Sequence, residues 1–251
     1  GFTQLMQMDP ENPLNEPQSY NLERVVSAGN HLLALINEVL DLSKIEAGKI
    51  DLKMESVSMQ KILQEVVSLS QPSALQNNVS LNITGLQQPD VFINGDYLRI
   101  KQILLNLVSN AIKFNKPEGS VNVYFSNKTE GKTTISVTDT GSGLSPENLS
   151  KLFTPFERFE AGSTSIEGTG IGLTISQKLA QAMQGTIEVV STLGKGSTFS
   201  LELPVFIKPT LEKFAGVTPV STSKATITAG KKILYIEGIY ENIELVRQIL
   251  L

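Results

Sequence analysis

The sequence contains no cysteine, no tryptophan and only one histidine. Without cysteine the chain has no disulfide, no thiolate metal ligand and no thiol nucleophile. It also has no run rich in lysine and arginine, and its formal net charge of −4 gives no general attraction to nucleic acid. No hydrophobic run approaches membrane-spanning length, and the first residues lack the pattern of a signal peptide. We therefore expect a cytoplasmic chain with no nucleic-acid partner and no membrane contact of its own.

The chain is nevertheless long enough, at 251 residues, for a buried core and for more than one domain. Hydrophobic residues make up 40% and charged residues 18% of it, as in a folded protein rather than a disordered one. Because it starts at Gly1 without a methionine, we expect it to be a piece of a longer protein. A membrane anchor upstream of that piece stays open for the parent protein.

A long helix is predicted from Gln18 to about Ala47. Pro17 suits its first turn, where a missing N–H costs nothing, and Gly48 ends the pattern. Hydrophobic residues recur in steps of three and four, and a second row makes the stripe too wide for a lone surface helix. We therefore expect residues 18–47 to form a homodimer as part of a four-helix bundle. The rows are Leu22, Val25, Gly29, Leu32, Ile36 and Val39, and then Val26, Leu33 and Leu40.

The stretch Asp96–Asn115 is predicted to be the central helix of the rest of the chain. Asn106, Asn110 and Lys113 fall on one stripe beside its hydrophobic side. Two interpretations of that stripe stay open from the helix alone. The amides face solvent, or their oxygens and the ammonium hold a metal ion and phosphates. The residues of the hydrophobic side are Ile100, Ile103, Leu104, Leu107, Val108, Ala111 and Phe114.

Strands and further helices surround this helix without a regular βαβ order. The mixture predicts a two-layer α/β sandwich, in which helices cover one face of a mixed sheet. Residues 208–230 are rich in Thr, Ser, Pro and Ala and predict a linker, and residues 231–251 predict one strand and one helix of a further domain. The predicted strands are 50–58, 79–83, 91–93, 121–126, 133–138, 186–191 and 198–204, and the predicted helices are 59–74 and 173–184.

Two glycine clusters mark places where the backbone could approach a ligand. Asp139-Thr140-Gly141-Ser142-Gly143 follows a predicted strand, where an Asp could accept a hydrogen bond from an amino group such as that of adenine. A plain turn is the alternative. Gly168-Thr169-Gly170-Ile171-Gly172 precedes a predicted helix, whose first N–H groups form an anion site. No strand directly precedes this second cluster and the P-loop pattern is absent, so it is not a dinucleotide fingerprint or a P-loop.

Between the clusters, aromatic residues flank a run of small ones. Residues 152–159 read LFTPFERF and are followed by the small-residue run Ala161–Ser165. This arrangement predicts a lid with anchored ends. A partly buried loop is the alternative.

The order of these motifs resembles that of sensor histidine kinases. Asn106–Asn115, DTGSGL, the phenylalanine-rich segment, GTGIGL and GKGSTF follow each other as the N, G1, F, G2 and G3 boxes of that family. Upstream, GNHLLALINEVLDLSKIEAGKI is similar to the second helix of the dimerisation and phosphotransfer hairpin. Downstream, KKILYIE and NIELVRQIL are similar to the first strand and helix of a response-regulator receiver. The resemblance implies a hybrid-type kinase fragment: a truncated hairpin at 1–49, an ATP-binding catalytic domain at 50–207, a linker at 208–230 and a truncated receiver-like segment at 231–251.

The resemblance also implies ATP and Mg²⁺ as cofactors and gives residues their roles. Asn110 would coordinate Mg²⁺ with Asn106 beside it, and Lys113 would contact the phosphates. Phe114 would lie along the adenine, and Asp139 would accept a hydrogen bond from its amino group.

Further roles concern the lid and the base. Arg158 would reach the γ-phosphate, and Thr198 would support the adenine. Gly141 and Gly143 would make room for the base. The second glycine cluster would hinge the lid and present amides to phosphate; its implied ATP-binding residues are Gly168, Thr169, Gly170, Gly172 and Leu173.

The implied activity is phosphoryl transfer from ATP to a histidine, for relay to a receiver aspartate on a fused or separate partner. The family's acceptor histidine lies on the first helix of the hairpin, and we expect this chain to start beyond it. Gyrase- and chaperone-type ATPases of the same fold carry a water-activating glutamate where this sequence has Asn106, and an amide is no general base. Such an ATPase, or a nucleotide-binding module without kinase activity, is the alternative.

Overall fold

The computed structural model describes residues 2–8, 13–85, 90–128, 131–157 and 169–206. The chain forms two units, residues 1–208 and 209–251, and the second lies outside the described residues, as does the whole of the predicted linker 208–230. The helices are α1 (Phe2–Gln7), α2 (Glu16–Glu46), α3 (Met59–Gln76), α4 (Tyr97–Lys113), α5 (Pro146–Lys151) and α6 (Gly172–Ala182). The strands are β1 (Glu55–Ser58), β2 (Ser80–Thr84), β3 (Phe92–Gly95), β4 (Ser120–Lys128), β5 (Lys132–Asp139), β6 (Thr186–Thr192) and β7 (Gly196–Pro204).

Five strands form a mixed sheet in the order β2-β4-β5-β7-β6. Only β2 and β4 run parallel, and the other neighbours are antiparallel. β1 and β3 form a separate antiparallel pair, which meets the chain just after the end of β7 through a bridge between Ile93 and Val205. The sheet therefore combines hairpins with a crossover, as the irregular order of predicted elements indicates.

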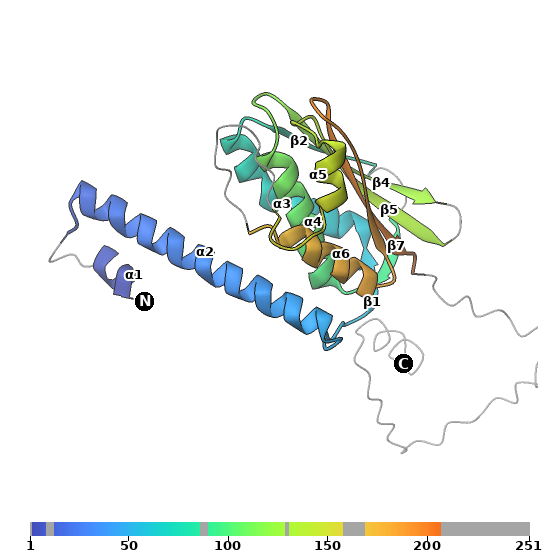
Figure 1. Cartoon of the computed structure of the whole chain (residues 1–251), viewed down its shortest axis with the longest axis horizontal. Helices are drawn as coiled ribbons and strands as arrows, with labels where there is room; N and C mark the ends of the chain where they lie inside the picture. The colour runs from blue at the N-terminus through green and yellow to red at the C-terminus, as the bar shows by residue number, and fades with distance from the viewer. Residues whose placement is uncertain (1, 9–12, 86–89, 129–130, 158–168, 207–251) are drawn as a thin grey trace, which may run out of the picture. The chain divides into compact units, whose positions relative to one another are not determined.

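Helices α3, α4 and α6 lie over one face of this sheet (Figure 1), with α4 in contact with both α3 and α6. The sequence explains the central position of α4, because its hydrophobic residues recur at helical spacing and are removed from water. All the residues predicted for its buried side are buried except Phe114, which caps the helix and is half-buried. The fully buried members of this side are Ile100, Ile103, Leu104, Leu107 and Val108.

On the facing parts of β5 and β7, the opposite face of the sheet carries short hydroxyl side chains. Ile135 and Val137 on β5 point into the core, so Ser136 between them and Thr138 after them point the other way. There, Ser136 and Ser200 pair across the strands with 3.0 Å between their hydroxyl oxygens, and Thr138 and Thr198 pair at 2.9 Å. A face of this kind needs no second layer of helices, which confirms the predicted two-layer sandwich.

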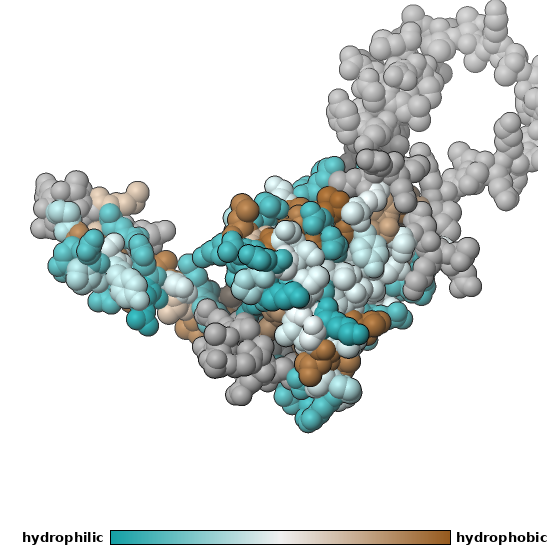
Figure 2. Space-filling view, turned by 90° about the horizontal axis from the view of Figure 1, so that it is seen from above, coloured by the Kyte–Doolittle hydropathy of each residue, from teal (hydrophilic) through white to brown (hydrophobic). Residues whose placement is uncertain are grey.

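Surface hydrophobic residues of the described part are dispersed. On the face that Figure 2 shows, hydrophobic areas are small and separated by hydrophilic ones. The long helix α2 differs, because six of its aliphatic side chains, besides the ring of Tyr20, are exposed along its length. These residues are Val25, Leu32, Leu33, Ile36, Val39 and Leu40.

Helix α2 confirms the predicted helix and shows how the sequence starts it. The side chain of Asn15 accepts a hydrogen bond from the backbone N–H of Gln18, and the side chain of Gln18 accepts one from the N–H of Asn15. This capping box satisfies two N–H groups that a helix otherwise leaves without partners, and Pro17 occupies the first turn.

Three expectations for secondary structure were wrong. The predicted strand 50–58 is a strand only from Glu55, because Ile50 and Leu52 pack on the core without a strand partner. Two short helices, α1 and α5, were not predicted. The start of α5 carries a recognisable signal, since Ser145 caps it and Pro146 follows in the first turn.

Candidate functional site

The polar stripe of α4 faces the first turns of α6. The side-chain amide of Asn106 donates a hydrogen bond to Ser176 Oγ on α6, at 2.9 Å, and its oxygen accepts one from Asn110 Nδ2, at 3.4 Å. A Cβ on Gly172 would lie 2.7 Å from Asn106 Oδ1, so glycine lets the start of α6 approach this side chain. Asn106 is therefore an inward-facing amide, and the solvent interpretation is wrong for it.

Asn110 presents an oxygen that fits a metal ion. Its NH₂ group is directed at Asn106, and no residue in the described part of the chain donates a hydrogen bond to its Oδ1. An amide oxygen is a ligand that Mg²⁺ accepts together with phosphate oxygens and water. The described residues include no group of three His, Cys, Asp or Glu side chains that could hold a metal by themselves. A metal here would therefore depend on a ligand that brings its own oxygens.

The second glycine cluster is held at the start of α6. No side chain caps α6 at Ile171, so the first N–H groups of the helix are open to an anion except where the cluster itself uses them. The backbone N–H of Ile171 donates to Thr169 Oγ1 at 3.2 Å. Thr169 in turn donates to Glu38 Oε2 on α2, at 2.6 Å.

The two ends of the predicted lid meet at this cluster. The backbone N–H of Phe156 donates to the carbonyl of Gly170 at 3.1 Å. Gly170 has a positive φ of 72°, and a Cβ there would lie 2.8 Å from the carbonyl oxygen of Glu157. The ends of the segment are thus anchored to each other. The segment itself, with the predicted site residues Arg158 and Gly168, lies outside the described residues.

Asp139 lies at the end of β5 with only 7% of its surface exposed. Burial raises the pKa of its carboxyl group, and hydrogen bonds from the backbone N–H groups of Gly141 and Ser197 partly offset that rise. The bond from Gly141 to Oδ1 measures 2.7 Å. A buried carboxylate that is stabilised by backbone donors can select a ligand's amino group.

The first glycine cluster packs against the end of α4. A Cβ on Gly141 would lie 2.3 Å from the carbonyl oxygen of Phe114, and Ser142 donates its N–H to the same carbonyl at 3.3 Å. Lys113 Nζ lies 5.3 Å from the centroid of the Phe114 ring. The structure therefore brings Asp139, Gly141, Lys113 and Phe114 to one end of α4.

The turn before β7 completes this neighbourhood. A Cβ on Gly143, where φ is 64°, would lie 2.1 Å from the carbonyl oxygen of Thr192, and one on Gly196 would lie 2.0 Å from that of Asp139. Ser191 Oγ joins the two turns, because it accepts a hydrogen bond from the N–H of Leu144 and lies 2.9 Å from Ser197 Oγ. Glycines are required at both close approaches.

The expectation for Thr198 needs a correction. Its hydroxyl pairs with Thr138 on the open face of the sheet, away from the core side of β5 that carries Asp139. Side chains alternate along a strand, so the neighbouring Ser197 is the residue of this turn that lies with Asp139. The role of Thr198 was implied by the resemblance alone, and the pairing of β5 with β7 puts its side chain on the other face from Asp139.

Three residues of this region were not predicted from the sequence. Ser176 holds Asn106, Ser197 donates to Asp139, and Glu38 binds Thr169 from a helix more than a hundred residues away. Strand alternation could have identified Ser197. Nothing in the spacing of α2 indicates Glu38.

Comparison with known proteins identifies the two parts of the chain. Residues 95–207 match the family described as histidine kinase-, DNA gyrase B- and HSP90-like ATPase. Residues 1–48 match the His Kinase A (phospho-acceptor) domain. The first match contains both glycine clusters and α4, and the second contains α2.

Several curated proteins are similar along most of the chain. The non-motile and phage-resistance protein of Caulobacter vibrioides is 40% identical over 210 residues, which are 82% of this chain and 25% of that protein. The signal transduction histidine-protein kinase BarA of Escherichia coli K12 is 33% identical over 242 residues, 94% of this chain and 25% of BarA. The chain thus spans about a quarter of the length of these relatives.

Among solved structures, full-length ShkA in complex with AMPPNP superimposes with a TM-score of 0.69 at 30% identity, over 81% of this chain and 42% of ShkA. No helix in the part of the chain that the structure describes is long and apolar enough to cross a bilayer. The family matches cover residues 1–48 and 95–207, and the second range contains the asparagine stripe, the two glycine clusters and the buried Asp139. The chain belongs to the sensor histidine kinases of two-component signalling.

Proposed function

We propose that this chain binds Mg²⁺–ATP between α4, α6 and the turn after β5, and transfers the γ-phosphoryl group to a histidine. The observation that carries the proposal is the meeting of Asn106 and Asn110 with the uncapped start of α6. Helix N-terminal N–H groups favour phosphate, and Asn110 Oδ1 would coordinate a metal ion bound to that phosphate. When bound, Mg²⁺ would neutralise charge on the phosphates.

Asp139 would make the site select adenine over guanine. Its carboxylate would accept a hydrogen bond from the adenine amino group, with Phe114 along the ring and Gly141 leaving space for it. Guanine presents a carbonyl at that position, so it would meet a carboxylate that has no hydrogen to donate. Lys113, at the last turn of α4, would contact the phosphates, and Arg158 would reach the γ-phosphate. Thr169, Gly168, Gly170, Gly172 and Leu173 would form the phosphate side of the site.

Asn106 favours transfer to a protein over hydrolysis. A gyrase- or chaperone-type ATPase activates water with a carboxylate at this position. Here the amide is held by Ser176 and Asn110, and an amide cannot take a proton from water. The site would hold ATP until an acceptor histidine is in line with the γ-phosphate, because phosphoryl transfer depends mainly on placement.

The same proposal assigns partners. The exposed hydrophobic stripe of α2 would pair with a second copy of the chain to form the dimer, with 1–49 as the hairpin part and 50–207 as the catalytic domain. Steps of three and four residues along the stripe suit a helical bundle. A response-regulator receiver, fused at 231–251 after the linker 208–230 or separate, would take the phosphoryl group from the histidine.

Two measurements on the chain test the nucleotide part. Calorimetry should show binding of Mg²⁺–AMPPNP, and the release of inorganic phosphate from ATP should stay near the uncatalysed level. Rapid phosphate release would favour the ATPase alternative. Binding without any transfer to a supplied histidine helix would favour a regulatory nucleotide-binding module.

A further inference from the structure

One face of α2 lies against the catalytic part of the chain. The partly or fully buried residues on the second half of this helix follow steps of three and four. Glu38 and Asp41, one turn apart on that face, each contact an element of the proposed nucleotide site. Asp41 Oδ2 pairs with Arg99 Nη1 on α4 at 3.1 Å, and Glu38 binds Thr169. The residues of this face are His31, Leu35, Glu38, Asp41, Leu42 and Ile45.

The contact of Glu38 continues into the phosphate side of the site. Thr169 gives its hydroxyl hydrogen to Glu38, and the oxygen of the same hydroxyl accepts the N–H of Ile171. The hydroxyl therefore fills the place of an anion on one of the first N–H groups of α6. As long as Glu38 fixes the direction of that hydroxyl, the N–H of Ile171 is engaged within the chain.

We propose that Glu38 is a positioning residue of the nucleotide site, which holds Thr169 over the Ile171 N–H and opposes the entry of a triphosphate until the contact is released. The inference rests on the proposed function, since it assumes that phosphate is bound at the start of α6. Two effects act in the same direction. A phosphate must displace the Thr169 hydroxyl to reach this N–H, and the negative charge of Glu38 repels it nearby.

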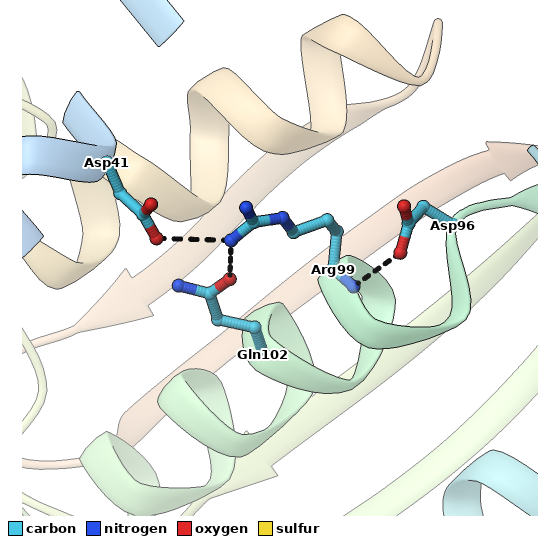
Figure 3. A network of polar contacts seen from close by, with 4 residues as sticks. All are labelled: Asp41, Asp96, Arg99 and Gln102. Atoms are coloured by element: carbon cyan, nitrogen blue, oxygen red, sulfur yellow. Dashed lines mark hydrogen bonds and ion pairs between the residues drawn. The ribbon is translucent and has the colours of Figure 1, made fainter. Parts of the chain in front are cut away.

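The contact of Asp41 supplies a matched comparison on the same helix. Arg99 is held from three sides, because its backbone N–H donates to Asp96 Oδ1 and its guanidinium donates to Asp41 and to Gln102 Oε1 (Figure 3). This network lies in the first turn of α4, while Asn110 lies eleven residues further along the helix, or about 16 Å. Asp41 therefore docks α2 without touching the glycine cluster.

The contact and the proposed dimer use opposite sides of α2. Residues such as Ile36 and Val39 are exposed, and they are displaced by about half a turn of the helix from Glu38 and Asp41. A substitution at Glu38 therefore leaves the proposed dimer stripe intact, and its effect can be measured on the full chain.

The test is calorimetric titration of the full chain with Mg²⁺–AMPPNP. Glu38→Ala removes both the acceptor and the charge, and should tighten binding on the order of five- to tenfold at low salt. Glu38→Gln keeps an acceptor oxygen for Thr169 without the charge, and should lie between Glu38→Ala and the unaltered chain. Asp41→Asn and Glu46→Gln remove a carboxylate charge from the same helix without touching the cluster, and should change affinity less than twofold.

The outcomes separate this inference from the function on which it rests. Unchanged or weaker binding by Glu38→Ala overturns the inference and leaves the proposed function standing. Equal tightening by Asp41→Asn also overturns it, because docking of α2 as a whole would then be the cause. If the unaltered chain binds no Mg²⁺–AMPPNP, the proposed function fails, and the inference with it.

A distance measurement gives a second readout, which loss of stability would not imitate. Because the chain has no cysteine, Asn37→Cys on α2 and Gln181→Cys on α6 can carry spin labels at exposed positions. With the labelled chain diluted into unlabelled chain, Mg²⁺–AMPPNP should lengthen or broaden the distance between them, because the Glu38 contact has to be released. Glu38→Ala without nucleotide should keep the distance of the unaltered chain, because Asp41 still docks α2 on Arg99. A distribution that nucleotide leaves unchanged in the unaltered chain contradicts the inference, as does one that Glu38→Ala alone shifts.

Discussion

The substitution Asp139→Asn tests how the site would choose its nucleotide. The carboxylate accepts hydrogen bonds from two backbone N–H groups, of Gly141 and Ser197, and in our proposal accepts a third from the adenine amino group. Asparagine has one acceptor oxygen in place of two. In the variant, at least one of the three donors must therefore face the NH₂ group, which is itself a donor.

The magnitude follows from the loss of a hydrogen bond to a charged acceptor, which is about 1.5–3 kcal/mol. This corresponds to binding of Mg²⁺–ATP weakened about 10- to 100-fold, since every 1.4 kcal/mol is about tenfold. Guanine offers a carbonyl at the matching position, so the variant should gain affinity for GTP relative to ATP. Calorimetry with both nucleotides measures each effect. ATP binding within twofold of the unaltered chain, or equal ATP and GTP affinity in that chain, would refute the assignment.

The same carboxyl gives a pH dependence with a defined sign. Burial raises the pKa of Asp139 in the folded chain, so the folded state binds the proton more tightly than the unfolded state. The stability that this group contributes is then present below its unfolded pKa, about 3.9, and is lost as pH rises through the raised value. Relative to Asp139→Asn, the unaltered chain should lose stability in urea titrations as pH rises above about 4. A difference in unfolding free energy between the two proteins that does not change with pH contradicts the raised pKa of Asp139.

Three further predictions concern the metal, a turn and the dimer. Asn110→Ala should weaken Mg²⁺-dependent nucleotide binding by about tenfold or more. The melting temperature should not fall, because the Asn110 side chain is only half-buried. Retained nucleotide affinity in calorimetry contradicts the metal assignment. Gly143→Ala should destabilise the fold by more than about 2 kcal/mol in denaturant titration. Gly131 also has a positive φ but lies in open space, so Gly131→Ala should destabilise it by only about 1 kcal/mol. Equal destabilisation by the two substitutions would refute the role of the contact with Thr192. Ile36→Asp should convert the dimer to a monomer in sedimentation experiments. Leu69→Asp on α3, at a similarly exposed residue, should leave the dimer intact. An unaltered chain that sediments as a monomer would refute the proposed dimer.

Hydrophobic spacing was enough to predict helices α3, α4 and α6 and the strands of the five-stranded sheet. The buried side of α4 and the length of α2 follow from steps of three and four residues, which a long helix repeats often enough to be unambiguous. Short elements lack that repetition. Helices α1 and α5 have six residues each, and only the capping pair Ser145 and Pro146 marks the second of them.

The candidate site was predictable where one element carries it, and not where two distant elements meet. Asn106, Asn110 and Asp139 follow from single stretches of sequence, and the structure brings them near the glycine clusters. The role of Thr198 came from the resemblance, which does not say on which face of a strand a side chain lies, and there a step of one residue changes the face. Glu38 lies 131 residues from Thr169, and a contact of that separation depends on the packing of α2, which no local pattern encodes.

Transfer of labelled phosphate to histidine tests the central claim most directly. The chain would be extended at its N-terminus by the first hairpin helix of a relative, with its histidine, and incubated with Mg²⁺ and ATP labelled on the γ-phosphate. The account predicts acid-labile, alkali-stable label on the extended chain, and none when the added histidine is changed to glutamine or when Asn110→Ala is present. The chain without the extension should stay unlabelled, although it retains His31 on α2. Label on that shorter chain that disappears with His31→Gln, or ATP turnover to free phosphate without label on any histidine, would contradict it.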